Sequence, residues 1–254
     1  MKPSGNTILI TGATSGIGLG MALRFQRAGN KVIVAGRRTA LLQQITREHP
    51  DIESLELDVA EPQSIAAARE HVLARFPDLN VLVNNAGIML PENVLKADSL
   101  EVAEWTIAVN LLGTIRMTHA FLPQLMTKDN GVLINVSSSL AFVPFPAALT
   151  YGATKAAVHS FTESLRVQLA ETAVRVIEIV PPGVRTTLFG QENDDQAMPL
   201  EEFLTETLAL LHGEHVPNEV VVDRAKFLRF AEANGQYGDV FAMLSAIPAP
   251  GQDH

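Results

Sequence analysis

The chain has 254 residues, of which 47% are hydrophobic and 19% charged, and it contains no cysteine. This composition excludes a disordered or fibrous chain, a disulfide framework, thiolate catalysis and a zinc site with cysteine ligands. The 19 Lys and Arg against 28 Asp and Glu give a net charge of −9, which argues against nucleic-acid binding. The sequence shows no signal-peptide core and no membrane-length apolar run, so we expect a soluble cytoplasmic protein without a membrane partner.

Short apolar runs alternate with longer amphipathic segments. Several runs are apolar at consecutive positions, which is typical of strands in a parallel sheet covered on both faces; they lie at 7–11, 31–35, 53–57, 81–84, 132–137 and 174–180. The intervening segments predict helices at 16–29, 38–48, 62–76, 99–127 and 151–171. This alternation predicts an α/β fold with a doubly wound parallel sheet of the Rossmann type in three layers. Its ligand crevice lies at the carboxyl ends of the strands.

The alternation stops after residue 186. A polar, acidic stretch at 191–195 precedes two further predicted helices, at 200–212 and 223–233. We therefore predict a single domain over residues 1–254 with a mainly helical C-terminal part. Residues 187–222 are expected to cross the crevice as a substrate loop or lid, although a plain surface insertion fits the pattern nearly as well.

A glycine-rich loop, Thr-Gly-Ala-Thr-Ser-Gly-Ile-Gly at residues 11–18, joins the first predicted strand to the first predicted helix. Glycines permit the tight turn and let backbone N–H groups approach a pyrophosphate at the helix N-terminus. The spacing differs from the commoner Gly-x-Gly-x-x-Gly, and glycine-rich turns can also simply end strands. The strand before the loop and the helix after it favour a dinucleotide site.

The end of the second predicted strand distinguishes two nucleotides. An NAD site has an acidic residue there for the ribose 2′-hydroxyl, whereas an NADP site has an Arg for the 2′-phosphate. Residues 35–38 read Ala-Gly-Arg-Arg, without a carboxylate. Arg37 is therefore the candidate phosphate clamp, assisted by Arg38 or Ser15, and we expect NADP(H), with NAD(H) as the alternative. A solvated arginine pair at a helix start is the other interpretation.

Tyr151 and Lys155 lie four residues apart at the start of a predicted helix and so share a face. To act as a base near neutrality, a tyrosine needs its pKa lowered by about three units from about 10, or about 4 kcal/mol. A cation at about 4 Å supplies about 1 kcal/mol in water and about 4 kcal/mol at an effective dielectric constant of about 20. Lys155 therefore suffices only in a partly dry crevice. On spacing alone, an ordinary surface pair is the simpler interpretation.

Polar residues at neighbouring strand ends favour the catalytic interpretation. Three serines at 137–139 end the fifth predicted strand, where a hydroxyl can hydrogen-bond a substrate oxygen. Asn-Asn-Ala-Gly at 84–87 ends the fourth, and Asn110 lies within a predicted helix although Asn is a poor helix former. Each also has an ordinary interpretation, as a turn residue or a solvated amide.

Together these motifs make the chain resemble the short-chain dehydrogenase/reductases over nearly all of residues 5–188, and in particular a bacterial subgroup of short-chain oxidoreductases. Five features match in order and spacing: the Thr-Gly-x3-Gly-Ile-Gly loop, Asp-Val at 58–59, Asn-Asn-Ala-Gly at 84–87, a serine thirteen residues before the tyrosine, and Tyr-x3-Lys. The resemblance implies an NAD(P)(H)-dependent oxidoreductase that interconverts a carbonyl and an alcohol by hydride transfer. The alternative is a dinucleotide-sensing or partner-binding protein on the same fold.

The resemblance also implies roles for single residues. Ser138 would polarise the substrate carbonyl, Tyr151 would be the acid/base, Lys155 would hold the nicotinamide ribose and lower the tyrosine pKa, and Asn110 would anchor a water in a proton relay. The implied cofactor contacts are Gly12, Gly16, Ile17 and Gly18 at the pyrophosphate, Asp58 and Val59 at the adenine, Asn85, Ala86 and Gly87 at the ribose, and Val184 and Thr186 (or Thr187) at the nicotinamide carboxamide.

The C-terminal part departs from the family pattern. The usual last strand, ending in a Val-Asp-Gly-Gly-like segment, is missing, and residues 223–247 read as helix. Since that segment often helps build the tetramer, we expect a homodimer through the helices at 99–127 and 151–171 instead.

The substrate is expected to be a small, apolar carbonyl or alcohol, because apolar residues flank the predicted crevice: Leu140, Phe142, Val143, Phe145, Leu188 and Phe189. An ordinary core cluster is the competing interpretation. No metal site is expected, since His212 and His215 alone are a weak ligand set.

Overall fold

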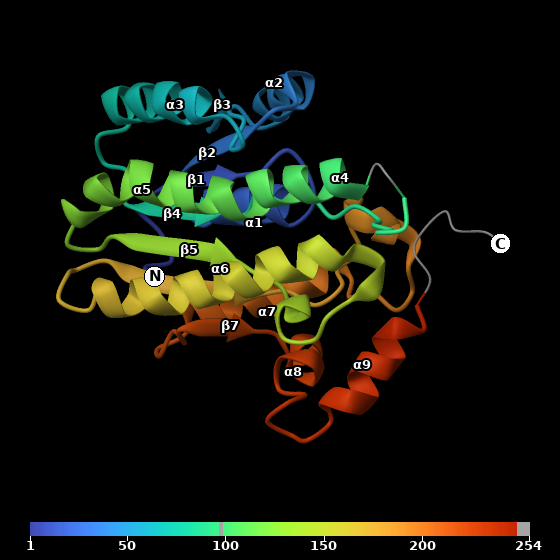
Figure 1. Ribbon diagram of the computed structural model, residues 1–254. Coiled ribbons are helices and arrows are strands. Elements are labelled where there is room, and N and C mark those ends of the chain that lie inside the picture. The colour runs from blue at the N-terminus through green and yellow to red at the C-terminus, as the bar shows by residue number, and fades with distance from the viewer. Residues whose placement is uncertain (97–98, 248–254) are drawn as a thin grey trace.

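The computed structural model describes residues 1–96 and 99–247. Its centre is a seven-stranded parallel sheet in the order β3-β2-β1-β4-β5-β6-β7 (Figure 1). The strands are β1 (Thr7–Thr11), β2 (Lys31–Gly36), β3 (Ile52–Glu56), β4 (Val81–Asn84), β5 (Val132–Val136), β6 (Arg175–Val180) and β7 (Glu219–Val221). The order reverses between β1 and β4, the switch point at which such folds bind ligands. The predicted doubly wound, Rossmann-type α/β fold is confirmed.

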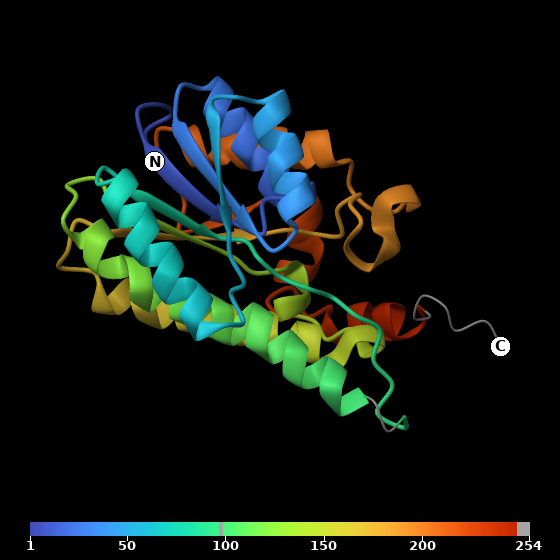
Figure 2. The same cartoon turned by 90° about the horizontal axis from the view of Figure 1, so that it is seen from above.

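Helices cover both faces of the sheet (Figure 2). One layer contains α1 (Gly16–Arg27), α2 (Thr39–Glu48) and α7 (Leu200–His212), and the other contains α3 (Pro62–Arg75), α5 (Gly113–Met126) and α6 (Leu149–Gln168). Successive side chains of a strand enter opposite layers: Ile8 packs in the cluster of Phe25 and Phe203, whereas Leu9 packs in that of Phe121. Because both clusters are buried, the strands are apolar at consecutive positions, as the sequence analysis assumed.

The helix predicted at 99–127 is interrupted by a π-helical turn. It consists of α4 (Ser99–Thr106), the π-helix η1 (Ile107–Leu112) and α5, with the buried Asn110 inside η1. Such π-helical turns mostly occur as single turns inside α-helices and are frequent at functional sites. In the described part of the chain, no helix is both long and apolar enough to cross a membrane.

The prediction that the last strand is missing is wrong. β7 pairs in parallel with β6, Glu178 facing Glu219, and Val222 and Asp223 follow it directly. The strand has only three residues, which is shorter than the four to eight apolar residues by which a buried strand is recognised in a sequence. The chain after β7 is helical as expected, in α8 (Asp223–Arg229) and α9 (Tyr237–Ser245).

The prediction that residues 187–222 cross the crevice is wrong for residues 200–222. Helix α7 packs on α1. Leu204 of α7 is fully buried, and a Cβ added at Gly20 of α1 would lie 2.4 Å from the Leu204 side chain. Arg24 of α1 also pairs with Glu201 of α7 at 2.7 Å. Helix α7 is therefore part of the helical layer that covers the sheet and does not cross the crevice. Residues 187–199, with the short helix η4 (Leu188–Asn193), stay the candidate substrate loop.

Candidate active site

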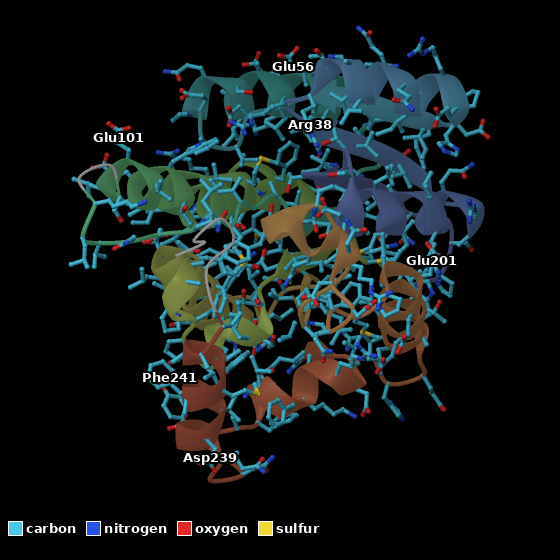
Figure 3. The ribbon with its side chains drawn as sticks, turned by 90° about the vertical axis from the view of Figure 1, so that its right-hand side faces the viewer. Arg38, Glu56, Glu101, Glu201, Asp239 and Phe241 are labelled. Carbon is cyan, nitrogen blue, oxygen red and sulfur yellow. The ribbon has the colours of Figure 1, made fainter. Side chains whose placement is uncertain are left out.

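A cavity of about 880 Å³ opens at the carboxyl ends of the strands, the end seen in Figure 3. In that view Arg38 lies on the side of α2, and Phe241 marks α9 on the other side. All but one of the predicted catalytic and cofactor-binding residues line this cavity: Gly12, Ser15, Gly16, Ile17, Gly18, Arg37, Arg38, Asp58, Val59, Asn85, Ala86, Gly87, Ser138, Tyr151, Lys155, Val184 and Thr186. The exception, Asn110, lies directly behind Gly87.

The glycine loop is fixed against the end of β4. The Thr11 hydroxyl accepts hydrogen bonds from the backbone N–H groups of Asn85 and Ala86, each at 3.0 Å, and the Asn85 amide donates to the Thr11 carbonyl at 3.0 Å. Gly12 has a φ of 65°, and an added Cβ would lie 2.7 Å from the Ala86 Cα. An added Cβ at Gly18 would lie 2.5 Å from the Asn85 amide nitrogen. The loop and the α1 N-terminus thus form a backbone-lined cradle that fits a pyrophosphate.

Replacement of Gly18 by Ala is expected to lower the free energy of unfolding by about 1–3 kcal/mol, because the new methyl group overpacks the loop against Asn85. NADPH affinity should fall as well, since the loop must move. Gly238→Ala is the matched control, because a Cβ there meets nothing within 4 Å. Urea unfolding and fluorescence titration measure both effects. Equal results for the two variants would contradict the close packing.

The two arginines after β2 take different positions. Arg38 donates to the hydroxyls of Thr14 at 2.6 Å and Ser15 at 2.6 Å, so its guanidinium lies on the glycine loop. Arg37 turns toward Asp58, with 3.6 Å between the charged atoms. Arg37 was predicted as the phosphate clamp, assisted by Arg38 or Ser15, whereas contact with the glycine loop is made by Arg38. Both side chains remain at the cavity wall.

The remaining predicted cofactor contacts have separate anchors. Asp58 accepts a hydrogen bond from the backbone of Ala60 at 2.9 Å, which fixes the turn after β3. Val184 forms an isolated parallel bridge with Met198. Thr186 lies over Gly16, where an added Cβ would be 3.3 Å from its methyl carbon. This contact favours Thr186 over its neighbour as the residue that faces the loop.

Ser138, Tyr151 and Lys155 meet at the cavity from two elements, the end of β5 and the first turns of α6. All three are buried. The Ser138 hydroxyl oxygen accepts from the Leu140 N–H at 3.1 Å, so its O–H can donate to the neighbouring Tyr151 oxygen or to a substrate oxygen. The Lys155 ammonium donates to the Val136 carbonyl at 2.8 Å and lies 5.6 Å from the centre of the Tyr151 ring. The arrangement can polarise a carbonyl and transfer a proton to it.

Burial dominates the titration of this pair. It raises the pKa of Tyr151 to about 12, an effect that the Ser138 side chain partly offsets. It lowers the pKa of Lys155 to about 8, opposed by the negative charge of Glu178. The expected lowering of the tyrosine pKa by Lys155 is therefore absent. The Lys155 ammonium donates to the Val136 carbonyl, and the desolvation of the phenol outweighs the effect of the ammonium charge. At neutral pH the phenol is protonated, the form that donates a proton.

Asn110 holds the loop after β4. Its side-chain oxygen accepts from the Ile88 N–H at 2.8 Å, and its amide donates to the Ile88 carbonyl at 2.9 Å and to the Thr154 hydroxyl at 3.2 Å. An added Cβ at Gly87 would lie 3.4 Å from the Asn110 oxygen and 3.6 Å from the Lys155 nitrogen. Asn110 therefore packs the loop against Lys155. Its place in a proton relay stays a prediction.

Glu92 anchors the start of α6 and is not among the predicted site residues. Its carboxylate is buried, accepts from the Thr150 hydroxyl at 2.8 Å and lies 3.2 Å from the Thr150 N–H. A carboxylate at a helix N-terminus is stabilising, and this one fixes the turn that carries Tyr151. No local motif marks Glu92, because its partner is 58 residues away in the sequence.

The other half of the cavity has an apolar wall. Two predicted members lie elsewhere: Phe142 packs edge to face on His159, with 4.7 Å between ring centres, and Val143 is fully buried in the core. The contribution of α9 and its neighbours was not predicted, since nothing local in the sequence places that helix beside the loop that follows β5. The wall consists of the predicted Leu140, Phe145, Leu188 and Phe189, and of Met89, Leu90, Leu228, Met243, Leu244 and Ile247.

Comparison with known proteins defines the class. The family model described as short chain dehydrogenase matches residues 6–197. The chain therefore belongs to the short-chain dehydrogenase/reductase family of NAD(P)-dependent oxidoreductases, as the resemblance indicated.

Individual relatives cover most of the chain. The uncharacterized oxidoreductase DltE of Bacillus subtilis is 41% identical over 249 residues, which is 96% of this chain and 98% of the relative. The NADP-dependent 3-hydroxy acid dehydrogenase YdfG of Salmonella typhi is 38% identical over 193 residues, 74% of this chain and 78% of the relative. The crystal structure of a short chain dehydrogenase from Burkholderia cenocepacia in complex with NADP has a TM-score of 0.81 at 29% identity and covers 98% of this chain and 100% of that one.

Proposed function

We propose that the protein is an NADP(H)-dependent oxidoreductase that interconverts an apolar carbonyl compound and its alcohol. The observation that carries this proposal is the meeting of Ser138, Tyr151 and Lys155 in the cavity that the glycine loop also lines. When bound, the nicotinamide nucleotide supplies the hydride that the carbonyl carbon receives.

The chain's own residues direct the proton and the substrate oxygen. Ser138 donates a hydrogen bond to the carbonyl oxygen, and Tyr151 transfers its phenolic proton to that oxygen as the alcohol forms. The Lys155 ammonium places a positive charge beside Tyr151 and beside the expected position of the nicotinamide ribose. Asn110 fixes the loop against which Lys155 packs. In alcohol oxidation the same groups act in reverse: Tyr151 accepts the proton in its phenolate form, which is a small fraction at neutral pH because burial raises the phenol pKa to about 12.

A screen of NADPH consumption across aldehydes, ketones, quinones and ketosteroids tests this function. We expect turnover of at least one apolar carbonyl class. Saturable NADPH binding without turnover of any member of the panel would instead indicate a dinucleotide-sensing protein.

The choice of NADP(H) rests on the two arginines and on the absence of a carboxylate at the end of β2. The YdfG relative and the Burkholderia structure, each described with NADP, support it. A charged hydrogen bond contributes about 1.5–3 kcal/mol, so Arg38→Ala should weaken NADPH binding about 10–100-fold and leave NADH binding unchanged. Arg37→Ala should have a smaller effect, since Arg37 faces Asp58. Isothermal titration with both nucleotides measures this. Equal affinities that neither substitution changes would contradict the preference.

The substrate half of the cavity favours an uncharged substrate. In the described chain, the only Lys and Arg residues that line the whole cavity are Lys155 of the catalytic group and Arg37 and Arg38 beside the glycine loop and Asp58, and Asp194 adds a carboxylate. Residues 97–98 and 248–254 include neither Lys nor Arg. A substrate carboxylate would lie here without a cationic partner, which is unfavourable.

A 3-oxo acid and its methyl ester form a matched pair for this point. We expect kcat/KM for the ester to exceed that for the acid at least about tenfold, because the acid must lose hydration without gaining an ion pair. Steady-state kinetics with NADPH measures the ratio. An equal or higher kcat/KM for the acid would instead indicate that this chain acts on 3-hydroxy acids, the substrates in the name of its YdfG relative.

We also propose a homodimer through α4, α5 and α6. Apolar side chains on these helices and on η1, which joins α4 to α5, remain exposed, among them Leu100, Ile107, Leu112 and Val167. Light scattering at micromolar concentration tests this, and a single monomeric mass would reject it.

A further inference from the structure

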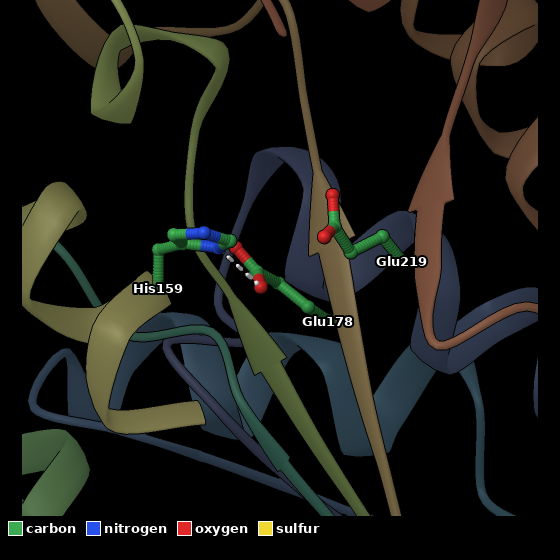
Figure 4. Close-up of side chains that lie close together, drawn as sticks. All are labelled: His159, Glu178 and Glu219. Carbon is green, nitrogen blue, oxygen red and sulfur yellow. Dashed lines mark hydrogen bonds and ion pairs between the residues drawn. The ribbon is translucent and has the colours of Figure 1, made fainter. Parts of the chain in front are cut away.

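A buried carboxylate lies beside the candidate site, and the mechanism above does not use it. Glu178 of β6 is fully buried; it accepts a hydrogen bond from the Ser137 hydroxyl at 2.5 Å and pairs with the His159 ring at 2.9 Å (Figure 4). A carboxylate removed from water costs several kcal/mol unless hydrogen bonds and charges compensate. The position of this carboxylate beside the candidate active site therefore requires an explanation.

The first partner connects Glu178 to Ser138. Ser137 directly precedes Ser138, and its N–H donates to the Ile179 carbonyl at 2.9 Å. The N–H of Ser139 donates to the Pro181 carbonyl at 2.8 Å. The hydrogen bond from Ser137 to Glu178 adds a side-chain link between the same two strands, so the chain on both sides of Ser138 is held to the β6 side.

The second partner connects Glu178 to the loop that follows Ser138. The His159 ring packs against Phe142, and the Arg229 guanidinium lies 4.1 Å from the centre of the Phe142 ring. Glu219 of β7 holds Arg229 with two bonds, at 2.6 and 3.0 Å. The loop at 137–142 is thus held at its beginning through Ser137 and at its end through Phe142.

Glu178 also acts on Lys155. Lys155 lies one helical turn before His159 on α6 and donates to the carbonyl of Val136, the residue before Ser137. The negative charge of Glu178 opposes the effect of burial, which lowers the pKa of Lys155.

The other charged groups around Glu178 are largely paired with one another. His159 of α6, whose pKa the hydrogen bond to Glu178 raises, also lies 3.6 Å from Glu163 of the same helix. Glu219 of β7 and Arg229 of α8 are paired together. Tyr151 faces Lys155 from α6 itself. Glu178 is therefore the carboxylate of the sheet whose charge acts on Lys155, which donates to the carbonyl of Val136 next to the Ser137 partner of Glu178.

We infer that Glu178 is a positioning residue of the active site: its buried carboxylate fixes the loop that carries Ser138 and supplies the negative charge that keeps Lys155 in its cationic form. The inference rests on the proposed function, in which Lys155 contacts the nucleotide.

A metal site is the competing assignment for this cluster. The potential ligand atoms of His159, Glu178 and Glu219 lie within 4.8 Å of one another. The Glu219 oxygens are bonded to Arg229, and one Glu178 oxygen accepts from Ser137. A divalent ion would have to displace the guanidinium, so the structure favours the ion-pair and hydrogen-bond role.

Glu178→Gln tests the inference, with Glu163→Gln as a matched control. The control makes the same chemical change on an exposed side chain that contacts the other nitrogen of His159. We expect Glu178→Gln to speed hydrogen–deuterium exchange in residues 137–142. It should also move the alkaline loss of NADPH affinity to lower pH by about one unit, because the charge that favours protonated Lys155 is gone. Glu163→Gln should change neither property.

Ser137→Ala separates the two effects and keeps the test decisive if Glu178→Gln does not fold. This variant leaves the carboxylate charged, so exchange in 137–142 should rise while the alkaline limb stays at the wild-type pH. Unchanged exchange in Ser137→Ala, or an unshifted limb in a folded Glu178→Gln, would overturn the inference. So would a rise in melting temperature with Zn²⁺ that His159→Ala abolishes. If wild type binds no NADPH, the proposed function fails, and that result is separate from the exchange measurement.

Discussion

Tyr151→Phe is expected to lower the rate of carbonyl reduction about 10²–10⁴-fold, the usual contribution of a general acid, while NADPH affinity stays within about twofold. The variant keeps the aromatic ring in its buried cluster with Met89 and Phe145 and removes only the hydroxyl. Since burial raises the phenol pKa to about 12, the proton is present throughout the neutral range and its loss is complete in the variant.

The chain offers a matched control for this substitution. It contains two tyrosines, and the other, Tyr237, is exposed on α9, where it stacks on Phe241. Tyr237→Phe makes the same chemical change outside the cavity and should leave the rate unchanged. Single-turnover kinetics with saturating NADPH compares the two. A Tyr151→Phe variant with more than about a tenth of the wild-type rate would move the acid role to another group.

Lys155→Met is expected to weaken NADPH binding about 10–100-fold and to lower the rate, because the cavity loses a buried cation that Met cannot replace. The pH dependence of NADPH binding is the more specific test of the role of Lys155. With the pKa of Lys155 at about 8, the cation is present below that pH and is lost above it. Wild-type NADPH affinity should therefore fall as pH rises through about 8.

The same profile in Lys155→Met should be flat between pH 7 and 9, since the titrating group is absent. Tyr151, with a pKa of about 12, does not ionise in that range and cannot produce the limb. Lys226→Met on the surface of α8 is the control and should keep the wild-type profile. An alkaline limb that persists unchanged in Lys155→Met would assign the titration to a different residue.

The sequence predicted most of the fold because the relevant signals are local. Strands such as β2, β4 and β5 contain three or more consecutive apolar residues, and the glycine loop lies between a strand and a helix, so its place at the α1 N-terminus followed directly. The spacing of Tyr151 and Lys155 placed both on one face of α6. The three-residue β7 and the π-helical turn at Asn110 were missed because each depends on packing against neighbours more than on its own residues.

The supports of the site were beyond local reasoning. Glu92 contacts a residue 58 positions away, and Glu178 contacts Ser137 across 41 positions. The sign of the tyrosine pKa shift was missed for the same reason: the lysine is close in sequence, whereas the burial that outweighs it comes from the whole cluster. Contacts between residues so far apart in the sequence depend on the order of the strands in the sheet, which local sequence patterns do not specify.

The most direct test follows deuterium from NADPH, labelled at the transferable position of the nicotinamide, into the product of an apolar ketone. We expect wild type to give an alcohol with one deuterium on the former carbonyl carbon, and Tyr151→Phe to give almost none in the same time. Wild-type protein that binds NADPH and transfers deuterium to no carbonyl, or a Tyr151→Phe variant that transfers it at the wild-type rate, would contradict the proposed chemistry.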